Sequence, residues 1–414
     1  MGLLDLFKRK LTHDDFAAMV IRRAREKGNP RKADYDAPGF CIAFELADGR
    51  PFTMNLHNAY RDTLAVAPGK RNAVIDTYLA SLLEAPREES PEETIASLMP
   101  TIRDTAMFAW GALQGRLAGF PAGDNDTCLR EFVGDLSVAL VVDSEHATRS
   151  ANRATLEKCG LGLDAAFAQA LANLRERTDD AGMQRHGNVW TSSWHDVFDA
   201  SRLLLTDMIH RLPVRGAPVA AIPTRNHLFV TGSLDDEGIA AMASVAADVL
   251  ENDTRPLSEQ LLVLRDGTWY PYEGALPSAT AARLTMARYK RLDGIHADQK
   301  ALLEKIHEKE GEDVFVASFR AVQDTTTGEI SSSGQWTRGV ATLLPHADYL
   351  RLWCKERHEM MDVPWAAAAE LIPALTTPEP ALSPRRYRVS VFPDDATYAA
   401  LKARAAVVRE IQPG

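Results

Sequence analysis

The sequence lacks any long hydrophobic segment. No window of the 414 residues contains the roughly 18 consecutive apolar residues that a transmembrane helix needs. The short apolar stretch at residues 1–7 is followed, rather than preceded, by basic residues, and this order differs from that of a secretory signal peptide. We therefore expect no integral membrane segment and a cytoplasmic location.

Cysteine is scarce as well. The chain has four cysteines, Cys41, Cys128, Cys159 and Cys354, and no C-x-x-C pair. Zinc ribbons and thioredoxin-like sites need such closely spaced pairs. Widely spaced thiols in a long chain without an export signal are typical of a reducing compartment. We expect free thiols, no disulfide and no zinc.

The motifs of common enzymes and cofactor sites are missing too. The sequence contains no G-x-x-x-x-G-K-[ST], G-x-G-x-x-G or G-x-S-x-G, so nothing predicts a phosphate cradle, a dinucleotide or a nucleophile elbow. We expect no cofactor. The string His358–Asp362 resembles a metalloprotease motif but has Asp362 where the second histidine should stand, so we interpret it as a solvated charge run. Residues 123–126 lack the glycine and closing glutamate of a calcium loop and predict a turn.

Positive charge is in deficit. The net charge is −10, and a field of that sign repels a phosphate backbone. The candidate for a local basic patch is residues 1–32, with nine Lys and Arg against four Asp and Glu. We expect no nucleic-acid partner. One interpretation of residues 1–10 is a weak anchor at the membrane surface. One short apolar stripe with three cations binds membranes only marginally, and this favours the alternative, a helix that docks on its own domain.

What the sequence does contain is the pattern of a folded protein with more than one domain. Hydrophobic residues make up 45% and charged residues 25%, values typical of globular chains. Pairs of strand-like runs flank turn residues, as at 47–50 and at Asp266-Gly267, while helical patterns occur singly between them. This arrangement favours an α+β fold with mainly antiparallel, hairpin-built sheets.

The periodicity assigns a type to most segments. Residues 94–120 are ambiguous between a helix and a loop. Predicted helices lie at 11–27, 73–83, 197–211, 235–250, 299–310, 365–375 and 394–408. Predicted strands lie at 40–46, 51–56, 136–143, 218–223, 227–231, 261–264, 268–272, 314–322, 337–343, 349–353 and 388–392.

Breaks in these patterns divide the chain into three predicted parts. Residues 1–95 form an N-terminal α+β subdomain, residues 96–275 a central α+β domain, and residues 285–414 a C-terminal α+β domain. Glycine and proline interrupt the pattern at 273–298 and at 376–384, so we expect exposed linkers there.

One stretch combines acidic and basic side chains at helical spacing. Asp196, Asp199 and Arg202 follow one another three residues apart, so on a helix they would share one flank. Paired carboxylates beside a guanidinium suit acid–base chemistry or the binding of a polar ligand. The alternative is a helix cap followed by an ion pair between Asp199 and Arg202, a common arrangement on helix surfaces.

The same stretch carries a family resemblance. Its pattern Asp-x-x-Asp-Ala-Ser-Arg-x-Leu resembles a motif of the bacterial YtpQ-like proteins, a family of unknown function. The resemblance covers residues 95–272 and, loosely, 1–95, and it departs from the family at Asn226, where an aspartate is common. It implies a bacterial cytoplasmic protein with the family's fold, and an extended rather than helical chain near residues 100–108. Further matching pieces are Pro100–Arg103, Leu136–Asp143, Ala172–Leu174, Ala221–Arg225, Arg255–Ser258 and Trp269.

Two hypotheses for the function follow. The first is a non-enzymatic interaction or adaptor protein with protein partners, because no nucleophile, metal or phosphate motif stands out. The second is a hydrolase-like enzyme whose polar residues surround one cleft. The sequence does not decide between them, and it leaves the substrate and the oligomeric state open. The candidate cluster comprises Arg103, Asp196, Asp199, Arg202 and Arg225.

Overall fold

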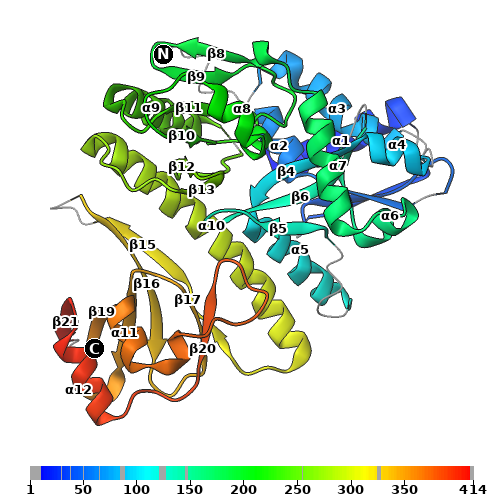
Figure 1. The fold of residues 1–414 in the computed structure, drawn as a ribbon. Coiled ribbons are helices and arrows are strands. Elements are labelled where there is room, and N and C mark those ends of the chain that lie inside the picture. The colour runs from blue at the N-terminus through cyan, green and yellow to red at the C-terminus, as the bar shows by residue number, and fades with distance from the viewer. Residues whose placement is uncertain are drawn as a thin grey trace, which may run out of the picture. The chain divides into compact units, whose positions relative to one another are not determined.

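The computed structural model shows a chain of helices and mainly antiparallel sheets, which confirms the α+β class (Figure 1). The chain divides into two compact units, residues 1–97 with 142–149 and residues 98–141 with 150–414. The expectations for residues 1–10 and 123–126 lie outside the described residues, and the three predicted domains stay a prediction. The structure describes residues 11–28, 30–37, 39–49, 51–64, 66–83, 89–120, 127–144, 148–253, 255–323 and 328–410.

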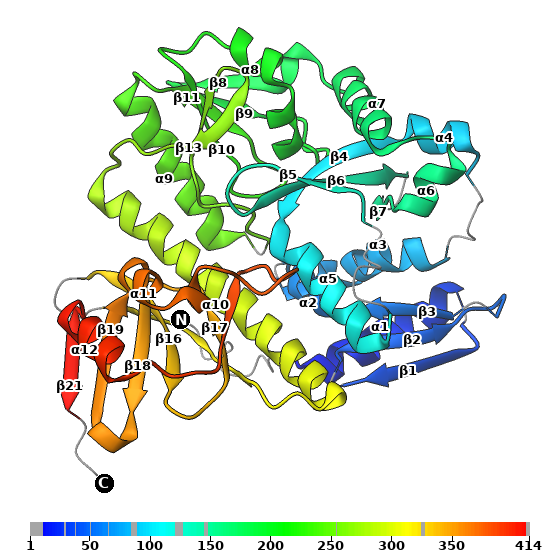
Figure 2. The ribbon, with the colours of Figure 1, turned by 60° about the horizontal axis from the view of Figure 1, so that its bottom comes forward.

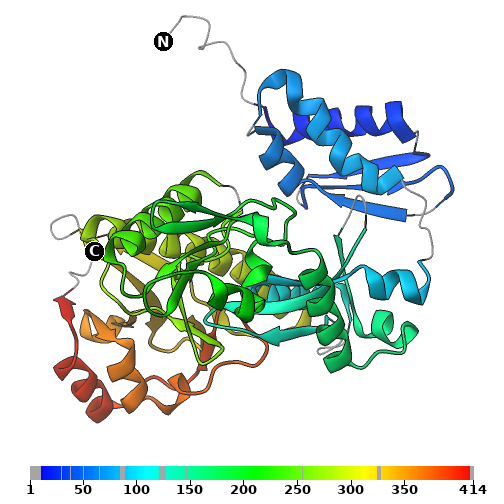
Figure 3. The same ribbon diagram turned by 45° about the horizontal axis from the view of Figure 1, so that its top comes forward.

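The first unit packs helices against one small sheet, as Figure 3 shows. Helix α1 (His13–Gly28) buries Phe16 and Val20, and the backbone N–H of Asp15 donates to the Thr12 hydroxyl at 3.1 Å, so Thr12 caps the helix predicted at 11–27. The predicted hairpin is also confirmed. The remaining elements are β1 (Lys32–Asp36), β2 (Cys41–Glu45), β3 (Pro51–Asn55), α2 (His57–Leu64), α3 (Arg71–Leu83) and α4 (Pro91–Ala96).

A second sheet has the strand order β4-β6-β5, with β7 pairing β6. Its central strand β6 (Leu136–Asp143) is buried along almost its whole length, as the continuous apolar run predicts. The ambiguous stretch at 94–120 resolves into β4 (Leu98–Asp104) followed by a helix, α5 (Thr105–Ala118). The other elements here are β5 (Leu129–Glu131), β7 (Thr148–Ser150), α6 (Arg153–Lys158) and α7 (Leu163–Glu176), and α7 packs on β4.

A third sheet is wholly antiparallel, with the order β13-β12-β10-β11-β9-β8. Helix α9 (Asp236–Asn252) lies on it and buries Ile239 and Met242 against Val219 and Val263 (Figure 1). The hairpin predicted at Asp266-Gly267 is confirmed, and the strands predicted at 218–223 and 227–231 pair with each other. The strands are β8 (Met183–His186), β9 (Val189–Ser192), β10 (Pro218–Ala221), β11 (Phe229–Gly232), β12 (Leu262–Arg265) and β13 (Thr268–Pro271).

The long helix α10 (Ser278–Glu310) corrects the prediction that a helix begins near residue 299 and that 273–298 is an exposed linker. Arg291 explains part of this difference, because its side chain is only 9% exposed and bonds Asp104, Asp135 and Glu259, which come from elements distant in sequence. The helix is therefore stabilised by polar contacts that leave no apolar stripe in the sequence.

The C-terminal part of the second unit holds two further sheets, with strand orders β14-β17-β20 and β15-β16-β18-β19-β21 (Figure 2). Their elements are β14 (Phe315–Val316), β15 (Phe319–Gln323), β16 (Ile330–Thr337), β17 (Thr342–Pro345), β18 (Tyr349–Cys354), β19 (Glu359–Pro364), α11 (Trp365–Leu371), β20 (Arg386–Val389), α12 (Asp395–Ala403) and β21 (Val407–Glu410). One core buries residues such as Trp336, Leu350, Trp365 and Tyr398.

Two predicted boundaries in this part are wrong. The single strand predicted at 337–343 is the end of β16 and the start of β17, because Gly339 makes a turn at φ 81°. The helix predicted to continue to residue 408 ends at Ala403. The β-branched residues Val407 and Val408 pair with β19 instead, as their preference for extended backbone favours.

Candidate functional site

The segment that carries the acidic candidates is not a helix. The helix predicted at 197–211 is an irregular stretch, a 3₁₀ turn (Ala200–Leu204) and a short helix, α8 (Thr206–Arg211). His195 and Val197 have positive φ angles of 52° and 68°. Left-handed backbone is unfavourable for a β-branched residue such as Val197, so surrounding contacts must hold this conformation.

An ion pair between Asp196 and Arg202 supplies part of that support. Nη1 and Nη2 of Arg202 donate to the two carboxylate oxygens of Asp196 at 2.8 and 2.7 Å, and Nε donates to the Thr178 hydroxyl at 2.9 Å. The guanidinium is fully buried and lies 4.0 Å from the ring centroid of Trp194. Burial alone would raise the pKa of the Asp196 carboxyl, but the hydrogen bonds and charge of Arg202 hold that pKa below its usual value. The pair therefore stabilises the fold and has no free guanidinium to offer a ligand.

Asp199 does not pair with Arg202, which corrects the ion pair considered from the sequence. The Asp199 side chain is fully buried, and its Oδ1 accepts a hydrogen bond from the His195 backbone at 3.3 Å. Its Oδ2 meets no hydrogen-bond donor among the described residues. A buried carboxylate with so few donors is costly to the fold and is a common feature of functional sites.

Backbone hydrogen bonds bring four distant segments to one place beside Asp199. The Ala200 N–H donates to the carbonyl of Arg225 at 3.1 Å, and the Leu257 N–H donates to the carbonyl of Pro223 at 2.7 Å. The Ile102 N–H donates to Ser201 Oγ at 3.3 Å. Strand β4, the 3₁₀ turn and the loops at 222–228 and 255–258 therefore meet here.

Three arginines lie at this junction: Arg103 on β4, and Arg225 and Arg255 on the two loops. All three side chains are partly exposed, and Arg103 Nη1 donates to the Ile102 carbonyl at 2.9 Å. Burial, together with repulsion by Arg225 and Arg255, lowers the pKa of Arg103 to about 10. We call Arg103, Arg225 and Arg255 the arginine cluster. An anion bound among these like charges would offset their repulsion.

Histidines stand beside the arginine cluster, at the end of the β9–β11 pair. The Ser192 N–H donates to the Leu228 carbonyl at 2.9 Å, and this bond lies at the end of the paired strands. His195 follows β9 and His227 precedes β11, so both histidines lie beyond the same end of the pair. His227 Nδ1 lies 2.7 Å from the Thr224 hydroxyl. Burial lowers the pKa of His227, the nearby charge of His195 lowers it further, and Asp253 and Asp199 oppose the shift. His227 is therefore neutral near pH 7 and able to take up a proton when an anion adds negative charge nearby.

Two more buried oxygens at the junction find no donor or acceptor among the described residues, Thr101 Oγ1 and Asn226 Oδ1. Thr101 is two residues from Arg103 on β4, and Asn226 follows Arg225 directly. Together with Asp199 Oδ2, they make the junction rich in unsatisfied polar atoms, whereas buried polar atoms elsewhere are normally paired.

The five predicted site residues are thus divided between the buried ion pair and the junction. Asp196 and Arg202 form the buried ion pair, Arg103 and Arg225 belong to the arginine cluster, and Asp199 is buried at the junction between the loops. Sequence reasoning did not select Arg255 or His227 as site residues. The only signal for Arg255 was its place in the string Arg255–Ser258, and His227 had no signal.

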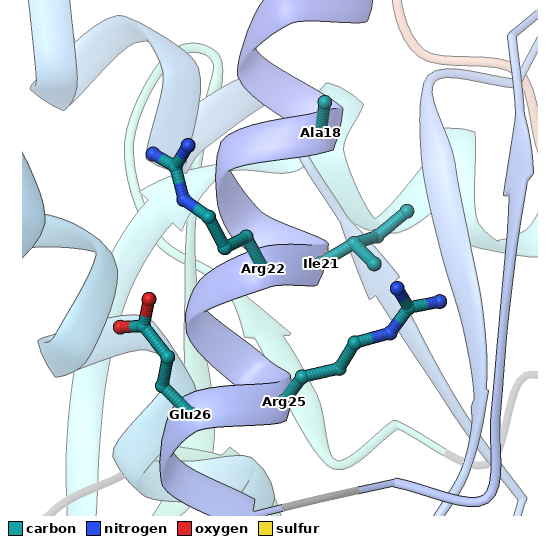
Figure 4. Close-up of a pocket in the computed structure, with 5 residues that line it drawn as sticks. All are labelled: Ala18, Ile21, Arg22, Arg25 and Glu26. Carbon is teal, nitrogen blue, oxygen red and sulfur yellow. The ribbon is translucent and has the colours of Figure 1, made fainter.

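A hollow beside α1 does not form a second candidate. It measures about 520 Å³, and Figure 4 shows its lining residues Ala18, Ile21, Arg22, Arg25 and Glu26, all from that one helix. Four of these five side chains are exposed, so the described residues provide no opposite wall that could enclose a ligand.

The string His358–Asp362 is not the solvated charge run that we expected, because most of it lies in β19 with two buried carboxylates. Glu359 bonds Lys402 and accepts from the Tyr398 hydroxyl at 3.1 Å, and Asp362 accepts from Arg351 at 2.6 and 2.8 Å. Each carboxylate thus has a structural partner. Within the part of the chain that the structure describes, no three His, Cys, Asp or Glu side chains are grouped to hold a metal ion.

Comparisons with known proteins identify no relative: no family model, no curated protein and no solved structure matches the chain. Among the helices of the described ranges, none combines the length and the hydrophobicity required to span a bilayer.

Proposed function

We propose that this protein binds a ligand with a phosphate or similar oxyanion group through Arg103, Arg225 and Arg255. The observation that carries the proposal is the junction itself, where hydrogen bonds between four segments gather three partly exposed guanidiniums. Guanidinium groups bind oxyanions through paired, charge-assisted hydrogen bonds.

The number of charges favours phosphate over a single carboxylate. Three guanidiniums carry three positive charges, and a phosphate monoester supplies close to two negative charges and three acceptor oxygens. A carboxylate supplies one charge and two oxygens, and one bidentate arginine satisfies it. The chain as a whole is acidic, with a net charge of −10, which opposes the binding of long polyanions such as nucleic acids and favours a compact ligand.

Binding without catalysis is the function that these contacts support best. The ion pair between Asp196 and Arg202 is internal, so a catalytic cluster of the five predicted residues loses two members. The hydrolase alternative now rests on Asp199, whose Oδ2 lacks a donor in the described chain, and on His227 beside it. Release of p-nitrophenol from p-nitrophenyl phosphate, lost in both Asp199→Asn and His227→Gln, would favour that alternative.

The wider setting is also a proposal. We propose a bacterial cytoplasmic protein related to the YtpQ-like family, with the C-terminal part at 311–410 as a surface for a protein partner. The partner would either carry the oxyanion group itself or respond to a small ligand bound at the arginine cluster. Purification from the native host, with mass spectrometry of bound proteins and metabolites, distinguishes these two cases.

Calorimetric titration with inorganic phosphate tests the anion site directly. We expect saturable binding to the wild-type protein and affinity about 10- to 100-fold weaker in Arg225→Gln, because one charge-assisted hydrogen-bonding group is lost. Arg265→Gln is the matched control, since Arg265 is an exposed arginine at the end of β12, outside the cluster. Absence of phosphate binding in the wild type, or an equal loss in Arg265→Gln, would refute the proposal.

A further inference from the structure

A separate cavity of about 340 Å³ lies in the second unit, between the start of α10 and the residues that lead into β6 and β12. Its walls come from three places in the sequence: residues 134–135, residues 259–261, and the stretch from Tyr272 to Arg288. None of the arginine cluster lines it, so it is independent of the proposed anion site.

The floor of this cavity is aliphatic. Leu261 and Leu284 are 4% and 6% exposed, and Leu276 lines the space beside them. The Tyr272 N–H donates to the Leu261 carbonyl at 2.8 Å, which fixes the floor to the rest of the wall. An alkyl chain lying on these leucines would remove apolar surface from water.

The rim of the cavity is short of positive charge. Glu259 and Asp135 line it, and both bond Arg291, Glu259 at 3.0 Å and Asp135 at 3.3 Å. Arg291 also pairs with the carboxylate of Asp104, so one guanidinium serves three acids. The second cation, Arg288, is mostly exposed and comes no closer to the Glu259 carboxylate than 3.9 Å. Three acids against two arginines leave a net negative charge.

We propose that this cavity binds an aliphatic amine, with the alkyl chain on the leucines and the ammonium group at Asp135 and Glu259. The volume supports a small ligand, since about 340 Å³ falls in the size range of small-molecule sites. The side chain of Glu259 is 10% exposed and therefore held at a fixed position, while that of Asp135 is 59% exposed and contacts Arg291 at the longer distance of 3.3 Å, which leaves it accessible to an ammonium group. An anionic or neutral ligand would lack the charge that complements this rim.

Three probes of equal length test the inference on the full-length protein. Calorimetry would compare n-pentylamine, 1-pentanol and pentanoate, which contain five carbon atoms each and differ in charge. We expect the amine to bind at least about tenfold more tightly than the alcohol, a factor that corresponds to about 1.4 kcal/mol, because an ammonium group donates charge-assisted hydrogen bonds to the carboxylates and a neutral hydroxyl does not. We expect no measurable binding of pentanoate. Equal binding of amine and alcohol, or no binding of the amine, would overturn the proposal.

Matched variants connect that preference to the cavity. In Asp135→Asn the preference for amine over alcohol should fall several-fold, and the exposure of Asp135 makes misfolding no concern. In Ala281→Leu the added side chain would fill the space and weaken both probes. Asp266→Asn, at the exposed β12–β13 turn, should leave binding unchanged. A preference that survives in Asp135→Asn, or is lost equally in Asp266→Asn, would refute the assignment.

Discussion

Replacing Asp196 and Asp199 separately by asparagine should have very unequal effects on stability. Asp196 neutralises a fully buried guanidinium, that of Arg202, through two hydrogen bonds at 2.8 and 2.7 Å. Removing one partner of a buried pair costs about 3–5 kcal/mol because it leaves the other charge uncompensated. The Asp196 side chain is 24% exposed, so water compensates part of the loss, and we expect about 3 kcal/mol for Asp196→Asn.

Asp199→Asn should cost little or should stabilise the protein. The asparagine keeps a carbonyl oxygen for the His195 N–H, and it removes a buried charge that has one hydrogen bond of 3.3 Å within the described chain. The sequence alone suggested an ion pair between Asp199 and Arg202, which would make Asp199 the larger contributor. The ion pair seen between Asp196 and Arg202 is the reason for the change.

Thermal melts of the two variants measure the difference. At roughly 2–4 °C per kcal/mol for a domain of 150–250 residues, 3 kcal/mol predicts a Tm lower by about 6–12 °C for Asp196→Asn. Asp199→Asn should melt at or above the wild-type temperature. A Tm loss in Asp199→Asn that equals or exceeds the loss in Asp196→Asn would show that Asp199, not Asp196, neutralises the buried guanidinium.

The pH dependence gives an independent check on the same pair. The folded-state pKa of Asp196 is depressed, so its contribution to stability is present above the unfolded pKa of about 3.9 and is lost as the pH falls through the folded value. The stability gap between wild type and Asp196→Asn should therefore be constant from pH 7 to pH 5 and close below about pH 4. A gap that is unchanged at pH 3 would contradict this origin.

Four further predictions concern other parts of the molecule. Sulfate, which does not titrate between pH 5 and 8, should bind more tightly as the pH falls. The reason is that burial depresses the pKa of His227 and a bound anion favours the protonated form of this histidine. In His227→Gln, binding titrations across this pH range should give one sulfate affinity. Arg386 is fully buried and donates to Gln299 and to the carbonyls of Ala317, Leu343 and His296, so Arg386→Gln should lower the free energy of unfolding by about 3 kcal/mol in denaturant titrations. Limited proteolysis should cut first within 376–384, an irregular stretch in which residues 376, 377, 380 and 381 are exposed, and not within 278–298, where α10 is helical. Early fragments ending near residue 285 would contradict this. Of the four free thiols, Cys159 should react fastest with a thiol reagent, ahead of Cys41, whose pKa is raised by burial and by the charge of Asp36, while the buried Cys128 and Cys354 stay unreactive in the native protein.

Several elements could be read from the sequence because their causes are local. The β12–β13 hairpin follows from Asp266 and Gly267, which adopt φ angles of 49° and 75° that a tight turn requires. Helix α9 follows from Asp235, whose carboxylate accepts from the Gly238 N–H at 3.0 Å, and from an apolar stripe behind it. Strand β6 follows from an unbroken apolar run.

Other elements could not be predicted because distant residues decide them. Asp196, Asp199 and Arg202 have helical spacing, yet His195 and Val197 adopt left-handed backbone beside the contacts that Arg202 makes with Asp196 and Trp194. The first half of α10 has no continuous apolar stripe, and Arg291 holds it through acids 32 to 187 residues away. A prediction that uses a window of neighbouring residues cannot include both Arg291 and the acids that it bonds.

The candidate site divides in the same way. The sequence by itself determined which residue types were present: carboxylates and an arginine at 196–202, and arginines at 103, 225 and 255. Only the tertiary structure decided that Arg202 would pair with Asp196 and be buried, and that the other three arginines would meet at one junction. The physical reason is that charge–charge contacts depend on distance in space, and the backbone hydrogen bonds that set those distances join segments far apart along the chain.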